Sequence, residues 1–194
     1  MKTSALAVAL AISFGGAAFA DIRGMDHVAL TVPNLGDAKS YFEKAFGCLS
    51  AYDLGPFADD KGTWMADNLG TDARAKLNIA VMQCGNASNV ELMEFSSEKQ
   101  NTAFPARQDY GAASVGFYVD DLEASVKQVQ DAGGELMGQI NSVGEGPIAG
   151  RTWAYTRAPW GQLVFLMNDG DGVAYDRQDG AVKMFSPRTV EPVN

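Results

Sequence analysis

Apolar and polar residues alternate along two short segments that align with each other without a gap. Residues 27–35 read HVALTVPNL and residues 114–122 read SVGFYVDDL. In each segment an alternating run typical of a strand ends in a turn or cap signal, and an amphipathic stretch with helical spacing follows. The chain is therefore predicted to contain the same structural unit twice.

Each unit is predicted to have the order βαβββ, which makes the fold class α+β. The two helices are expected over residues 35–46 and 122–132, and glycines (Gly47; Gly133 and Gly134) follow them as stop signals. The strands are expected at 25–32, 49–54, 76–83 and 90–95 in the first unit and at 113–119, 136–140, 152–157 and 163–167 in the second.

Two further segments stand outside this repeat. The connection 55–75 is either a lid over a pocket or a surface loop, and its length favours the lid. The polar stretch 169–194 is a C-terminal extension, either packed on the domain or disordered.

The first 20 residues are predicted to be a secretory signal peptide. They contain Lys2, an apolar stretch from Ala5 to Phe14 and the small-x-small ending Ala18-Phe19-Ala20. The apolar stretch is shorter than the about 20 residues that span a bilayer. Asp21 rather than Cys follows the cleavage point, so we expect a soluble, secreted product, periplasmic if the source is bacterial. The folded domain would then occupy 21–168, with modules 24–95 and 111–167.

Charge narrows the choice of partners. The chain has a formal net charge of −9 and no run of Lys or Arg that would follow a phosphate backbone, which argues against nucleic acid. After signal cleavage no apolar stretch remains for a membrane. Serine-nucleophile, CxxC, Walker and dinucleotide motifs are absent from the sequence, so those chemistries have no support in it.

Four features together resemble the vicinal oxygen chelate superfamily of glyoxalase-like and bleomycin-resistance-like proteins. They are the gapless repeat, His27 at the start of the first strand, the run Val90-Glu91-Leu92, and the turn Pro159-Trp160-Gly161-Gln162. The resemblance covers residues 24–167. It implies two βαβββ modules whose curved sheets form an open, cupped barrel. The modules pair within one chain or between two chains, so a homodimer is one of the two arrangements.

The resemblance also implies a divalent metal ion such as Zn, Mn, Ni or Fe, held by the first and fourth strands of each module. The matching positions in the first module are His27 and Glu91, which are ligand types that the family uses. The repeat places Ser114 and Phe165 at the equivalent positions of the second module. A hydroxyl and a phenyl ring are poor substitutes, because catalytic sites usually keep about three protein ligands.

His27 is the only histidine of the chain, so no second imidazole completes such a site. A cavity-facing pair of His27 and Glu91 that contacts a ligand is slightly favoured over a metal site. Glu91 interrupts an apolar strand, where a carboxylate needs a polar partner. Glu94, three residues further on, is expected on the opposite face in contact with water.

A second set of candidate ligand-binding residues lies on one predicted strand. Period-two spacing places two arginines and two aromatic residues on the same face: Arg151, Trp153, Tyr155 and Arg157. If this face lines the cavity, it would suit an anionic or planar ligand, with Ser114 and Phe165 nearby. If it faces water, it is only an exposed strand, and one sequence does not decide between the two.

The two cysteines are predicted to form a disulfide. Cys48 starts the second strand and Cys84 ends the third, and these strands should be antiparallel neighbours. Export to an oxidising compartment would favour the bond. Two separate buried thiols are the alternative.

Two functions remain after these observations. The first is a protein that binds a small molecule in the barrel cavity without metal, as bleomycin-resistance-like proteins do. The second is a divalent-metal enzyme of the same superfamily, a lyase, isomerase or ring-cleaving dioxygenase. The incomplete ligand set favours the first.

Overall fold

The computed structural model describes residues 24–85 and 88–169. The predicted signal peptide and the extension after Asp169 lie outside this part of the chain. The first module contains β1 (Val28–Thr31), α1 (Leu35–Phe46), β2 (Leu49–Phe57), α2 (Trp64–Leu69), β3 (Lys76–Cys84) and β4 (Ser88–Ser96). The second contains β5 (Ser114–Tyr118), α3 (Leu122–Asp131), β6 (Glu135–Ser142), β7 (Thr152–Arg157) and β8 (Leu163–Asn168).

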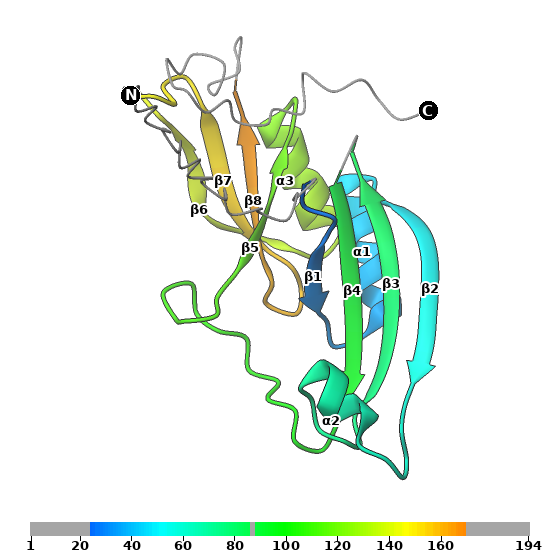
Figure 1. Ribbon diagram of the computed structural model, residues 1–194. Helices are drawn as coiled ribbons and strands as arrows, with labels where there is room; N and C mark the ends of the chain where they lie inside the picture. The colour runs from blue at the N-terminus through cyan, green and yellow to red at the C-terminus, as the bar shows by residue number, and fades with distance from the viewer. Residues whose placement is uncertain (1–23, 86–87, 170–194) are drawn as a thin grey trace, which may run out of the picture.

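Each module forms a four-stranded mixed sheet, and the two sheets have the same topology. The strand orders are β1-β4-β3-β2 and β5-β8-β7-β6. The first and last strands of each module pair in parallel, and the other neighbours are antiparallel. Figure 1 shows two twisted sheets side by side, cupped rather than closed into a barrel in the described part of the chain. The predicted pair of βαβββ modules is confirmed.

The strand register relates the two modules residue by residue. Val28 faces Val90 in the first sheet, and Val115 faces Val164 in the second. One step along, Ala29 faces Glu91 and Gly116 faces Phe165. The positions of Glu91 and Phe165 are therefore equivalent, and so are the residues just before the two valines, His27 and Ser114. This is the correspondence that the sequence repeat predicts.

Helix α1 begins and ends at the predicted residues, because local signals set both of its ends. The side chain of Asn34 accepts a hydrogen bond from the backbone N–H of Asp37 (2.8 Å). Gly47 ends the helix with φ 64°, a left-handed conformation that suits glycine. At the first turn, Glu94 accepts a hydrogen bond from the N–H of Leu35 (2.7 Å). The expectation that Glu94 is solvated was wrong: this half-buried carboxylate satisfies a free N–H at the start of the helix.

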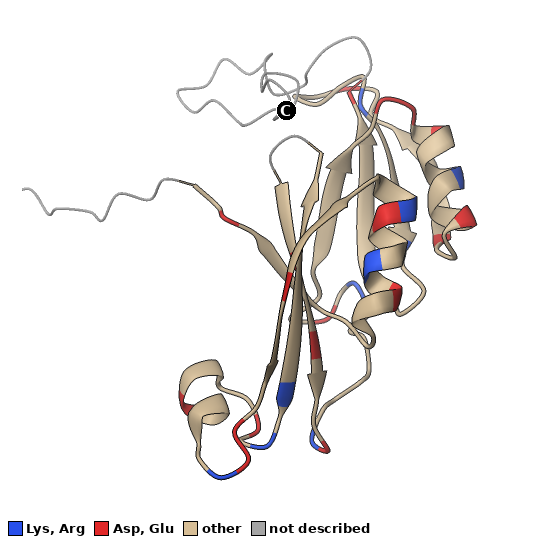
Figure 2. Ribbon diagram, turned by 90° about the vertical axis from the view of Figure 1, so that its right-hand side faces the viewer, with Lys and Arg blue, Asp and Glu red and all other residues tan. Residues whose placement is uncertain are grey.

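One shared core joins the two modules. α1 and α3 contact each other, and each also packs against the strands of its own module. The rings of Tyr41, Phe42 and Phe46 on α1 meet Phe117 of β5 and Trp160 of the β7–β8 turn. In Figure 2 both helices lie on the same side of the sheets, with acidic and basic residues along them. The modules therefore form a single hydrophobic unit.

Within residues 24–85 and 88–169 the other face of each sheet carries no long helix, and we call it the open face. The connection 55–75, predicted without regular structure, extends β2 to Phe57 and then forms α2. Met65 of α2 is fully buried against Leu77, together with the open-face residues Met93 and Phe95. In Figure 2, α2 lies on the side of the sheet opposite to α1. A pattern of six residues is too short to show helical periodicity, so the helix depends on this packing.

The structure joins Cys48 and Cys84 in a disulfide. Their Cα atoms lie 4.3 Å apart, and both residues are buried in the hydrophobic core. Antiparallel pairing of these strands brings Leu49 opposite Gln83, so the two cysteines, one residue further out, meet at the same end. No helix of residues 24–85 and 88–169 is long and apolar enough to cross a membrane.

We expect reduction of this disulfide to lower the free energy of unfolding by about 4 kcal/mol, because the bond closes a loop with a sequence separation of 36 residues in the unfolded chain. Urea unfolding with and without reductant would measure the change, with the Cys48→Ala/Cys84→Ala double variant as the control without a bond. Reductant should not affect that variant. Two thiols that react with alkylating agent in unreduced, denatured protein would contradict the bond.

Candidate functional site

The polar pair predicted on the first module is brought together on the open face. Nε2 of His27 lies 4.0 Å from Oε1 of Glu91. The side chain of His27 is 37% exposed and that of Glu91 is 21% exposed. On either side of Glu91 along β4, Val90 and Leu92 point to the core and are buried. The alternation of the strand therefore turns the carboxylate away from the helix and toward the open face.

Asp26 completes a short row of polar groups. Its carboxylate lies 2.7 Å from Nδ1 of His27, on the ring side opposite to Glu91. The hydrogen bond to Asp26 raises the pKa of His27 above its ordinary value of 6.5, partial burial opposes this rise, and the charge of Glu91 adds to it. An imidazole between two carboxylates is thus biased toward its charged form, so it can donate a proton or a hydrogen bond to a ligand.

The second module offers no equivalent polar pair. Ser114 is exposed at the first position of β5. Phe165 packs against the rings of Trp153 (5.8 Å between centroids) and Tyr155 (4.7 Å) on the same sheet. Within residues 24–85 and 88–169, no three His, Cys, Asp or Glu side chains gather closely enough to hold a metal ion.

The residues present therefore do not fit the metal ion that the resemblance implies. His27 and Glu91 would supply two ligands, whereas a small divalent cation in a catalytic site usually has about three protein ligands. A serine hydroxyl and a phenyl ring stand where further ligands would be needed.

The row formed by Arg151, Trp153, Tyr155 and Arg157 lies on the open face of the second sheet. Ala154 and Thr156, between the row's members, are fully buried toward α3. The row's two guanidinium groups bind carboxylates of this chain: Arg151 binds Asp169 (2.7 Å, both buried) and Arg157 binds Glu135 (2.9 Å). These arginines are thus already paired.

One aromatic residue of the row, Tyr155, contacts a segment between the modules. Trp153 and Tyr155 meet edge to face, with 5.8 Å between ring centroids. Cζ of Arg107 stands 3.7 Å from the centre of the Tyr155 ring, which is the geometry of a cation–π contact. We call residues 97–113, between β4 and β5, the linker. Arg107 therefore holds the linker against the open face of the second sheet.

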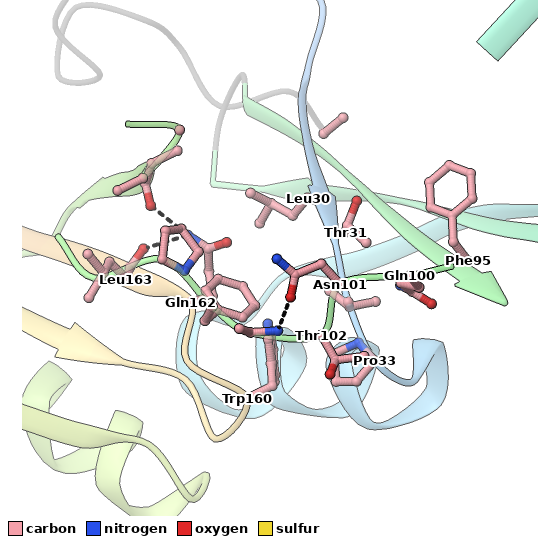
Figure 3. Close-up of a pocket in the computed structure, with 18 residues that line it drawn as sticks. Leu30, Thr31, Pro33, Phe95, Gln100, Asn101, Thr102, Trp160, Gln162 and Leu163 are labelled. Atoms are coloured by element: carbon pink, nitrogen blue, oxygen red, sulfur yellow. Dashed lines mark hydrogen bonds between the residues drawn. The ribbon is translucent and has the colours of Figure 1, made fainter. Parts of the chain in front are cut away.

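Sequence reasoning missed a cavity between the modules. It has a volume of about 420 Å³ and lies between β1, the linker and the β7–β8 turn (Figure 3). Thr31 and Phe95 belong to the same faces of β1 and β4 as His27 and Glu91. None of the predicted ligand-binding residues lines it. The only signal in the sequence was the length of the linker, since long connections are often functional.

Comparison with known proteins agrees with this architecture. The family model described as the glyoxalase/bleomycin resistance protein/dioxygenase superfamily matches residues 26–155. A 2-epi-5-epi-valiolone epimerase from Actinomyces sp. is 33% identical over 162 residues, which cover 83% of this chain and 87% of that protein.

Two solved structures share the fold. A glyoxalase family protein from Bacillus cereus has a TM-score of 0.61 and 24% identity, over 79% of this chain and 98% of that one. A glyoxylase/bleomycin resistance protein/dioxygenase domain from Frankia sp. has a TM-score of 0.50 and 12% identity, over 76% and 98%.

Fold and site define a two-module protein with cupped, mixed sheets and a polar pair on one open face. The chain belongs to the glyoxalase/bleomycin resistance protein/dioxygenase superfamily.

The single histidine allows a direct test of the polar row. We expect Asp26→Asn to lower the pKa of His27 toward its ordinary value, and Glu91→Gln to lower it by a smaller amount, because the hydrogen bond to Asp26 is the largest cause of the rise. NMR titration of the imidazole would give each pKa in protein without a histidine tag.

The same shift makes stability depend on pH. The folded-state pKa is raised, so the contribution of charged His27 is complete below pH 6.5 and is lost as the pH rises through the folded-state pKa. Asp26→Asn should flatten this dependence. If the pKa of the imidazole does not change in Asp26→Asn, the hydrogen bond between Asp26 and His27 is contradicted.

Proposed function

We propose that this protein binds a small organic molecule on the open face of its first module, at His27 and Glu91, without a metal ion. The observation that carries the proposal is the 4.0 Å approach of the two side chains, both partly exposed on a face that packing leaves free. An imidazole and a carboxylate side by side offer a hydrogen-bond donor and an acceptor to one ligand.

The surroundings of the pair support a binding role over a structural one. Val90 and Leu92, the neighbours of Glu91 along β4, are buried and pack that strand against the core. A partly exposed polar pair contributes little to stability. Its removal should therefore change recognition more than folding.

Export is part of the proposal. The N-terminal pattern predicts a signal peptide, and a disulfide between Cys48 and Cys84 suits an oxidising compartment such as the periplasm. The proposed protein would thus bind its ligand outside the cytoplasm.

We expect His27→Ala and Glu91→Gln to weaken ligand retention by roughly tenfold or more, while the free energy of unfolding changes by less than about 1 kcal/mol. His27→Ala removes a hydrogen-bonding group, and Glu91→Gln removes the charge that strengthens the hydrogen bond accepted at this position. Protein from the exported fraction would be denatured, and the small molecules released from wild type and variants would be compared by mass spectrometry. Lys127→Ala is the matched control, because it removes one partner of an exposed ion pair on α3.

A large loss of stability with unchanged ligand retention would make His27 and Glu91 a structural pair and end the proposal. Metal content gives a second measurement, after equilibration with Zn, Mn, Ni and Fe. Stoichiometric metal that is lost in His27→Ala would overturn the metal-free part of the proposal.

A second candidate is the divalent-metal enzyme that the family resemblance implies, and the similarity to the epimerase from Actinomyces sp. favours an epimerase. Incubation with 2-epi-5-epi-valiolone, with and without added metal, followed by NMR of the carbon skeleton, would test it. Turnover that requires metal and is lost in Glu91→Gln would establish this candidate. The absence of turnover under all metal conditions would exclude the substrate of that relative.

A further inference from the structure

The cavity between the modules differs from the His27–Glu91 site in its chemistry. The chain has a formal net charge of −9, yet no Asp, Glu, Lys, Arg or His is among the described residues that line the cavity. An ionic ligand would lose water there without meeting an opposite charge, which is costly. The lining therefore favours a neutral ligand.

The polar groups of the cavity are mostly carboxamides and hydroxyls. Oδ1 of Asn101 accepts a hydrogen bond from the backbone N–H of Ala103 (3.0 Å), which orients the amide and leaves its NH₂ group to donate (Figure 3). Gln100, Thr31 and Thr102 add groups that both donate and accept. A ligand with several hydroxyl or carbonyl oxygens matches this set.

Trp160 supplies a donor that lacks a partner. Its indole N–H is buried and makes no hydrogen bond within the described residues. A buried N–H of this kind costs free energy unless an acceptor is present. Trp160 lines the cavity, so an oxygen of a bound molecule could satisfy it.

Aromatic rings form a part of the apolar wall, beside aliphatic residues such as Leu30 and Leu163. Phe95 of β4 and Phe104 of the linker line the cavity together with Trp160. A ring compound that carries hydroxyl groups has the matching surface, because its C–H faces can pack on aromatic rings while its hydroxyls reach the polar groups. The volume of about 420 Å³ suits a molecule of this size.

We propose that the cavity is a binding site for a neutral, polyhydroxylated ring compound, separate from the site at His27 and Glu91. Neither His27 nor Glu91 lines the cavity, although the two sites adjoin each other, because Ala29 lines the cavity and pairs with Glu91 in the sheet. The ligand would rest on Phe104 and Trp160, with Asn101 and the indole N–H donating hydrogen bonds to its oxygens.

The test uses the full chain labelled with ¹⁵N and two neutral probes, D-glucose and myo-inositol. D-glucuronate, which differs from glucose by one carboxylate, is the charged comparison. The indole N–H signal of Trp160 is identified by its absence in Trp160→Phe. We expect a saturable shift of this signal with at least one neutral probe, and binding of glucuronate that is weaker than that of glucose by roughly tenfold or more.

The position of the shift decides where the probe binds. A shift of the Trp160 signal with little change at Trp153 places the probe in the cavity, whereas the reverse places it on the open face of the second sheet and overturns the proposal. If neither neutral probe shifts Trp160, or if glucuronate binds as well as glucose, the proposal also fails.

Asn101→Asp is the sharpest variant. It keeps an oxygen for the N–H of Ala103 but replaces the donating NH₂ group with a charged oxygen. We expect it to weaken binding of the neutral probe by roughly tenfold. Asn68→Asp on α2 adds the same charge away from the cavity and should leave binding unchanged. If Asn101→Asp misfolds, Asn101→Ala is used instead, and circular dichroism checks that it is folded. Unchanged affinity in a folded Asn101 variant would contradict the proposal.

Discussion

The packing of α1 against the second module is the constraint on which the rest of the structure depends. Tyr41, Phe42 and Phe46 stand between the two sheets and contact Phe117 and Trp160 of the second module. Phe42 is fully buried, and loss of such a ring typically costs about 3–5 kcal/mol. Because both sheets turn the same face toward this core, their other faces remain available. Those open faces and the junction of the modules are where recognition can occur.

Trp160 connects this core to the cavity. One part of its ring system packs on Tyr41 at 5.2 Å, and the residue also lines the space beneath the linker. The next residue, Gly161, has φ 109°, and a Cβ there would meet Phe104 at 2.9 Å. The turn thus requires glycine both for its backbone conformation and for the close approach of the linker. A substitution of Trp160 would therefore alter both the packing of the core and the wall of the cavity.

Sequence alone predicted the features that depend on local signals and on repetition. The bounds of α1 follow from Asn34 and Gly47, and the pairing of β1 with β4 places His27 next to Glu91 as the family pattern implies. Three features depend on distant contacts and were not predicted. They are α2, which relies on Met65, the hydrogen bond of Glu94 to α1, and the cavity under the linker. No window of the sequence shows which remote surface such segments will meet.

The two modules share one backbone topology and differ in the chemistry of their open faces. Where the first module has Glu91, the second has Phe165, whose ring packs on Trp153 and Tyr155. Arg107 of the linker stands on the Tyr155 ring. A carboxylate restored at position 165 would therefore enter an aromatic cluster beside a guanidinium group, which would compete with any metal ion for its charge. The second module could offer a metal ligand at position 165 only if this aromatic packing and the linker were also different. The departure from the family's metal site therefore involves several residues and not Phe165 alone.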